Sequence, residues 1–304
     1  MNEYWFRSRF QLRIHQSAGE AFQDFFSDLM NAVYGDRFQA VRPWGNLGDR
    51  GNDGFIADEA HYFQLHAPHA DSRPDPVGAA GKARDDFAKL LQAYPQLKHY
   101  TFVHNDRYRG MPVQVTDALQ DIASRFGVAA DGLDSRKLGN LFNRLSDDDR
   151  MAVLGATPVA VPQWIDPRDI ATLLEYLANR PMQGASLLDS GIAPEFNEKI
   201  KFNRLCPAFG DLLRSASYET GEVDSFLERE LGLAQHIAEE IREIYAKSKE
   251  EIPDTGEAAP DVRFLYVQRA LLPPSGRVNR GLEQAALVIM AKYFEACDIY
   301  ESPV

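Results

Sequence analysis

The sequence has few cysteines, no long apolar run and no secretory signal, and each absence removes a class of protein. Its two cysteines, Cys206 and Cys297, lie far apart and follow no metal-ligand spacing, which favours reduced thiols. No apolar stretch approaches the roughly 20 residues that cross a bilayer. The N-terminus lacks a basic segment followed by an apolar one. We therefore expect a cytoplasmic protein without membrane contact.

Several common catalytic signatures and an excess of basic charge are also missing. The chain contains no Gly-x-Ser-x-Gly elbow, no Gly-x-x-x-x-Gly-Lys phosphate loop and no His-Glu-x-x-His pair. With 33 Lys and Arg against 45 Asp and Glu, the net charge is −12. This balance argues against a protein that coats nucleic acid, which requires clustered cations. It does not exclude a nuclease, because a metal bound at an acidic site supplies positive charge itself.

What the sequence does contain is a glycine-punctuated loop followed by an alternating strand pattern. The loop carries Asp49 and Asp53 between glycines, and a short extended segment and a turn follow it. In the next run, Gln64 and His66 fall on one face. A hairpin with this pattern places Asp53 and Gln64 on neighbouring strands, within reach of one metal ion.

The segments 48–54 (Gly-Asp-Arg-Gly-Asn-Asp-Gly) and 64–66 (Gln-Leu-His) resemble the motifs of the PD-(D/E)xK nuclease superfamily, particularly its Mrr-like branch. The resemblance covers roughly residues 10–105. It implies an α/β restriction-endonuclease-like core that cleaves DNA with Mg²⁺ or Mn²⁺. The chain departs from the family at His66, where the family has a lysine. The alternative is a plain hairpin with a satisfied strand glutamine.

The resemblance also implies a set of metal ligands. Asp53 would be the central ligand, Asp49 and Glu20 would complete the acidic pocket, and Gln64 would add an amide oxygen. Mrr-like chains place a helix glutamate where this chain has Gln23, and Glu20 lies one turn earlier. Glu20 has a second interpretation, as part of a capping box at the helix start.

A cation near the attacking water would complete such a site. His66 or Lys82 would orient the water or neutralise charge, since the catalytic lysine can migrate to a neighbouring helix in this superfamily. A solvated helix lysine is the alternative for Lys82. The spacing of His66 and His69 invites a zinc interpretation, but an intervening proline and the lack of nearby cysteines weaken it.

The order of expected elements is helix, strand hairpin, helix, strand, and then helices almost to the end. The acidic run 147–149 is interpreted as a helix N-terminus. The segment 180–186 has the composition of a linker. We therefore expect a nuclease-like domain with a helical extension over 1–180 and an all-α interaction domain over 181–304.

The C-terminal third carries a second resemblance. Its ending 293–301, with 203–205 and 245–247 before it, is similar to the C-terminal domains of bacterial ABC-three-component defence systems. This implies an ABC-type ATPase and a middle-component protein as partners. The terminal helix is apolar from Ala285 to Ala291, which predicts burial on more than one side. Contacts to partners, a homodimer or packing within one helical domain would each provide that burial.

Together these features predict a metal-dependent DNA endonuclease effector of a bacterial anti-phage or mobile-element defence system. The alternative is a catalytically inactive nuclease-like recognition or adaptor subunit that partners an ABC-type ATPase. His66 in place of a lysine, and a carboxamide at Gln64, motivate this alternative. A helical adaptor whose N-terminal resemblance is accidental is a third hypothesis.

Overall fold

The computed structural model describes residues 2–42, 51–69, 71–158, 165–180, 196–228, 232–254, 258–274, 279–296 and 298–303. The chain divides into two compact units. One contains Arg13–Thr157, and the other contains Met1–Leu12 with Pro158–Val304. The division falls inside the first helix, α1 (Asn2–Gln16).

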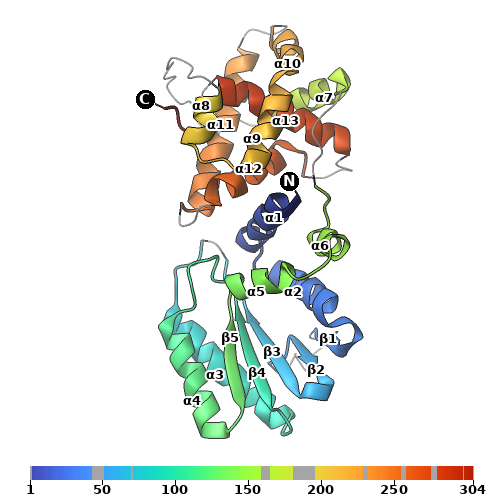
Figure 1. The fold of residues 1–304 in the computed structure, drawn as a ribbon. Helices are drawn as coiled ribbons and strands as arrows, with labels where there is room; N and C mark the ends of the chain where they lie inside the picture. The colour runs from blue at the N-terminus through green and yellow to red at the C-terminus, as the bar shows by residue number, and fades with distance from the viewer. Residues whose placement is uncertain are drawn as a thin grey trace. The chain divides into compact units, whose positions relative to one another are not determined.

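The unit Arg13–Thr157 is built on a mixed five-stranded sheet (Figure 1). Its strands stand in chain order, and β1, β2 and β3 are antiparallel neighbours, whereas β3, β4 and β5 are parallel neighbours. The strands are β1 (Phe38–Ala40), β2 (Gly54–Ile56), β3 (His61–His66), β4 (His99–His104) and β5 (Ala129–Leu133). The predicted hairpin is β2 and β3.

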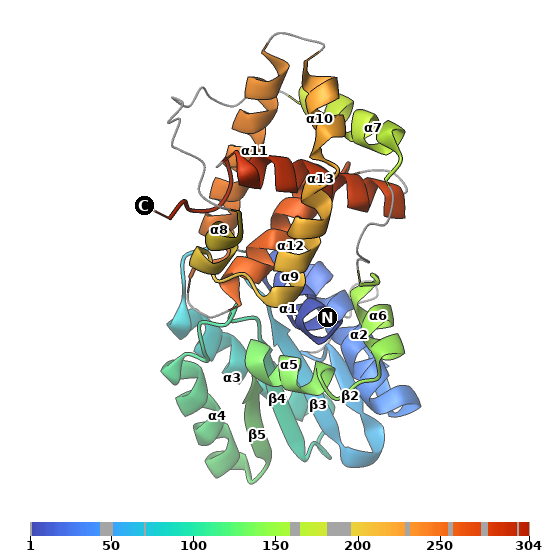
Figure 2. The same ribbon diagram turned by 45° about the horizontal axis from the view of Figure 1, so that its top comes forward.

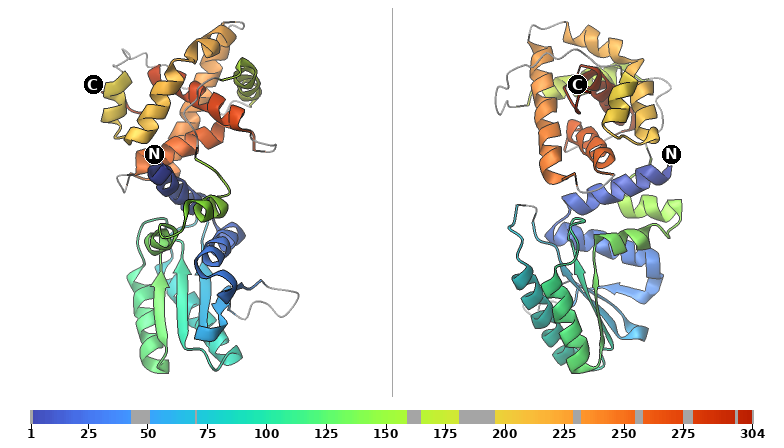
Figure 3. Two further views of the ribbon diagram at one scale, coloured as in Figure 1. Left: turned by 45° about the vertical axis from the view of Figure 1, so that its right-hand side comes forward. Right: turned by 60° about the vertical axis from the view of Figure 1, so that its left-hand side comes forward.

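Helices cover both faces of this sheet. On one face lie α3 (Pro76–Ala93) and α4 (Val113–Phe126), which connect the parallel strands and pack against each other (Figure 3). On the other face, α2 (Gly19–Tyr34) packs Phe26 against Phe63 of β3, with ring centroids 5.7 Å apart.

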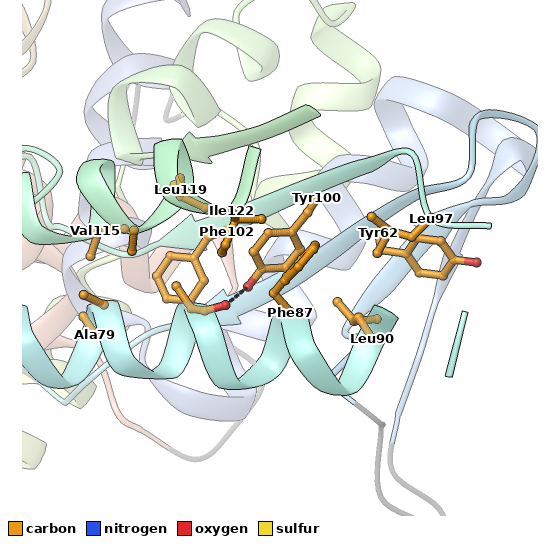
Figure 4. Packing of buried hydrophobic residues seen from close by; sticks show 13 residues of the cluster. Tyr62, Ala79, Phe87, Leu90, Leu97, Tyr100, Phe102, Val115, Leu119 and Ile122 are labelled. Carbon is orange, nitrogen blue, oxygen red and sulfur yellow. Dashed lines mark hydrogen bonds between the residues drawn. The ribbon is translucent and has the colours of Figure 1, made fainter. Parts of the chain in front are cut away.

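Alternation along the strands explains the main core. Tyr62 of β3 with Tyr100 and Phe102 of β4 point to the α3 and α4 face, where they pack against Phe87 and other apolar residues (Figure 4). Tyr100 is fully buried, and its hydroxyl donates to the backbone carbonyl of Ala83 at 3.1 Å. A buried phenol needs such a partner, so this bond fixes α3 against β4.

The remaining elements of this unit are short. They are the 3₁₀ turns η1 (Gly35–Arg37) and η3 (Ala57–Glu59), and the helices α5 (Ser135–Phe142) and α6 (Asp147–Leu154). The acidic helix start is confirmed, because Ser146 caps α6 and its hydroxyl accepts from the Asp149 amide at 3.2 Å. The sequence pattern did not indicate α1 or β5.

The C-terminal part of the chain is helical. Its helices are α7 (Pro167–Ala178), α8 (Phe196–Phe202), α9 (Pro207–Ser217), α10 (Thr220–Leu227), α11 (Leu233–Glu251), α12 (Ala259–Leu271) and α13 (Arg280–Glu295). The terminal helix α13 runs through the middle of this bundle and contacts α7, α9, α10 and α12 (Figure 2). Every residue from Ala285 to Ala291 is fully buried. The predicted burial on several sides is confirmed, and helices of the same unit provide it.

The compact units divide between Thr157 and Pro158, whereas the linker composition placed a domain boundary after residue 180. The two boundaries differ because α7 lies before residue 180 in the chain but packs on α11 and α13. Arg180, just after α7, donates to Glu240 of α11 at 2.8 Å and to the carbonyl of Ala270 in α12 at 2.7 Å. Helix α7 therefore belongs with the C-terminal helices.

Candidate functional site

Asp53 lies directly before β2 and is the most constrained of the predicted site residues. It is 7% exposed, and its backbone N–H donates to the carbonyl of Phe63 on β3 at 2.9 Å. Its carboxylate oxygen Oδ2 accepts from the backbone N–H of Leu65 at 2.7 Å. The other oxygen, Oδ1, accepts from the Gln23 side chain at 3.0 Å. Both oxygens of this buried carboxylate therefore receive hydrogen bonds.

Gln23 reaches Asp53 from α2, at the helix position where the Mrr-like resemblance implies a glutamate. Its Nε2 donates to Asp53 and also to the carbonyl of Val41 at 3.0 Å. Because both partners are acceptors, the nitrogen and not the oxygen of the amide must point to Asp53. Sequence analysis aligned Gln23 with this position but proposed Glu20 as the helix carboxylate of the metal site.

Glu20 and Asp49 are not brought to Asp53 within the described structure. Glu20 is exposed in the first turn of α2. Its capping box is not formed, because the N-cap residue is Ala18, which provides no side-chain hydrogen bond, and Ser17 is buried. Asp49 lies outside the described residues.

Gln64 is buried in β3, at 3% exposure. Its Nε2 donates to the carbonyl of Leu65 at 3.3 Å, while its Oε1 is buried without a hydrogen-bond partner among the described residues. A buried oxygen without a hydrogen bond lowers the stability of the folded state. The Gln64 oxygen is therefore either an unfavourable feature of the core or an atom that binds a ligand.

Lys82 lies on α3 and is engaged in an ion pair. Its Nζ donates to Asp86 at 2.5 Å, one turn along the helix, and Lys89 donates to the same carboxylate at 2.9 Å. Burial raises the pKa of Tyr100 well above its usual value, and the charges of Asp86 and Asp53 add to the effect. Sequence analysis missed Asp86, although its i,i+4 spacing from Lys82 was a signal for this pair.

His66 ends β3 beside His104, its register partner on β4. The two rings stack with centroids 5.2 Å apart. Burial, together with His104 and Lys82, lowers the pKa of His66 to about 4, against the opposing charges of Asp75 and Asp86. Burial also lowers the pKa of His104. Burial therefore disfavours the charged form of both imidazoles, so His66 is a poor substitute for the cation that the family has at this position.

These contacts give the described residues around Asp53 a poor fit to Mg²⁺. This ion takes oxygen ligands, commonly from more than one carboxylate. Around Asp53, an amide N–H₂ stands where the family resemblance implies a carboxylate, and no group of three or more His, Cys, Asp or Glu side chains suited to a metal occurs in the described ranges. The prediction of Mg²⁺ or Mn²⁺ stays a prediction.

The arrangement of helices α7 to α13 is the part of the chain that comparison with known proteins addresses. Residues 168–301 match the model of C-terminal domain 10 of the ABC-three component (ABC-3C) systems. The match begins inside α7 and ends after α13, so it spans the same helices that pack together from α7 onward.

The match confirms the C-terminal resemblance for residues 168–301. No curated protein and no solved structure matches the chain. The resemblance of the N-terminal unit to PD-(D/E)xK nucleases stays a prediction, while the mixed sheet and the helical C-terminal region are present. No helix among the described residues is long and apolar enough to cross a membrane.

Proposed function

We propose that this protein is the recognition or adaptor component of an ABC-3C defence system, with an N-terminal unit of nuclease-like ancestry that does not cleave DNA. Its helical region from α7 onward would bind the other components, an ABC-type ATPase and a middle-component protein. The family match supports this role for the C-terminal region.

The state of Asp53 carries the proposal for the N-terminal unit. A metal-binding carboxylate directs oxygen lone pairs at the metal. In Asp53, one oxygen accepts a hydrogen bond from Gln23 and the other accepts one from the Leu65 N–H. Charge-assisted hydrogen bonds of this kind stabilise an ionised buried carboxylate without a cation. Asp53 then holds α2, the loop before β2 and β3 together.

A metal-dependent DNA endonuclease is the second candidate. Two observations favour it: the order α2, β1, β2, β3, α3, β4, which is the order that the nuclease resemblance implies, and the closeness of Gly51, two residues before Asp53, to the backbone of Asp86, the partner of Lys82. In this case Lys82 would supply the positive charge that His66 lacks, and DNA would be the substrate. A homodimer would place two such sites on one duplex.

Metal titration and plasmid cleavage separate the two candidates. We expect the full chain to show no calorimetric heat with Mg²⁺ or Mn²⁺ and no plasmid cleavage, while it co-purifies with the ATPase and the middle component of its system. Cleavage that is lost in Asp53→Asn and in Lys82→Met, but kept in the exposed control Arg84→Met, would establish the endonuclease instead.

A further inference from the structure

A pocket of about 280 Å³ opens at the carboxyl ends of β3 and β4, in the unit Arg13–Thr157. His66 and His104, which end these strands, form one wall, and Pro76 and Gly78 at the start of α3 form another. Parallel strands commonly bind ligands outside their carboxyl ends. Of the predicted site residues that the structure describes, His66 lines this pocket, whereas Asp53, Gln64 and Lys82 do not.

Three arginines line the pocket, in a chain whose net charge is −12. Arg107 donates to the backbone carbonyls of Pro68 at 2.7 Å and of His15 at 3.3 Å, which hold it in the pocket wall. Arg73 and Arg109 are exposed, and their side chains form no hydrogen bond or ion pair with any residue that the structure describes. The pocket mouth therefore carries two cations ready to bind an anion.

The two carboxylates of the pocket are engaged by backbone amides. Asp75 caps α3 by accepting from the Gly78 amide at 2.8 Å. Asp106 accepts from the amides of Gly110 at 2.6 Å and Ser135 at 2.8 Å, and so shapes the loop after β4. These bonds leave both carboxylates charged, but the three arginines outnumber them, so the lining carries net positive charge and attracts anions.

His104, which is 8% exposed, contributes its ring to this wall. Its Nδ1 is enclosed and does not open to the pocket, so the arginines and not this atom define what the pocket binds.

We propose that the pocket binds a phosphate monoester of the size of a nucleoside monophosphate. Arg73 and Arg109 would bind the phosphate, since guanidinium groups pair with it through two parallel hydrogen bonds. Phosphate alone would leave much of the volume empty. The apolar rest of the lining, which includes Pro68, Pro74 and Pro112, suits a flat base.

The phosphate monoester has two sources, a free nucleotide or the 5′ phosphate at the end of a nucleic-acid strand. Both present the same terminal phosphate followed by a sugar and a base. The inference rests on the pocket alone and holds for either function proposed above.

The test is titration calorimetry of the full chain with the four common 5′-nucleoside monophosphates, the matching nucleosides and inorganic phosphate. We expect at least one monophosphate to bind with a Kd below about 1 mM, and its nucleoside and phosphate alone to bind at least about tenfold more weakly. The double variant Arg73→Ala/Arg109→Ala should weaken binding about tenfold or more, whereas the exposed α3 control Arg84→Ala should leave it unchanged.

A short oligonucleotide with a 5′ phosphate, compared with its 5′-hydroxyl form, distinguishes the two sources. Binding of the phosphorylated strand but of no free nucleotide assigns the pocket to strand ends and still supports it. The proposal is overturned if no phosphorylated ligand binds, if nucleosides bind as well as nucleotides, or if the double variant binds like the unchanged chain. Plasmid cleavage with an intact pocket would overturn the adaptor role and leave this inference standing.

Discussion

Asp53 is the residue for which a structural role and a metal-binding role predict opposite effects of substitution on stability. A buried carboxylate that accepts hydrogen bonds from Gln23 and Leu65 contributes to stability, and its loss leaves the Leu65 N–H without a partner. We expect Asp53→Ala to lower the free energy of unfolding by about 2–3 kcal/mol in urea titrations. The exposed control Asp71→Ala should change it by less than about 0.5 kcal/mol. If Asp53 instead belonged to a metal site in which neighbouring carboxylates repel one another, Asp53→Ala would raise the free energy of unfolding.

The buried histidines predict how stability depends on pH. Burial, with the nearby His99, lowers the pKa of His61 to about 4, and that of His66 is also about 4. The unfolded chain binds protons near pH 6.5 and the folded chain does not until about pH 4, so stability is full above about pH 7 and falls as the pH drops through this window.

Urea unfolding at pH 7.5 and pH 5 measures this effect. We expect the unchanged protein to lose roughly 1–2 kcal/mol per histidine between the two values, from the linkage between pKa and stability. His66→Gln should remove its own share of the loss, because glutamine does not titrate. The histidine account is wrong if the variant and the unchanged protein lose the same amount.

Among the elements, the residues just before β2 approach the backbone of α3 closely, and this approach requires a glycine at position 51. Its φ is +78°, and an added Cβ would lie 2.8 Å from the backbone oxygen of Asp86. We expect Gly51→Ala to destabilise the protein by roughly 2–4 kcal/mol, from left-handed strain together with this clash. Gly127, whose φ is +66° with open space around it, is the matched control. Gly127→Ala should cost only about 1 kcal/mol in thermal or urea unfolding.

At the scale of the whole molecule, the end point of a truncation decides whether the N-terminal unit can be isolated. A chain ending at residue 181 keeps α7 but loses α11 and α13, which cover it, and so exposes the buried Ile170, Leu173, Leu174 and Leu177. Each of these side chains contributes roughly 1.5–3 kcal/mol when buried. We expect this fragment to aggregate in light scattering, whereas residues 13–157 give a folded monomer. A soluble fragment ending at 181 would place the boundary where the linker composition put it.

Features that depend on local residue pattern were predictable from the amino-acid sequence alone. Alternation in 61–66 and helical periodicity in 19–34 and 280–295 are local, and they gave the hairpin, the amphipathic helix and the buried terminal helix correctly. Ser146 before three aspartates specified the start of α6 in the same way. The C-terminal family resemblance was also carried by short local motifs.

Which of the candidate side chains meet depends on how the elements pack. Glu20 and Gln23 lie one turn apart on α2, and the packing of this helix against β1 and β3 brings Gln23 to Asp53 and leaves Glu20 in solvent. Likewise, Arg73 is distant in sequence from His104 and Arg109, and the three line one pocket because two parallel strands end, and α3 begins, at the same edge. Such contacts depend on how elements pack, and no local pattern encodes them.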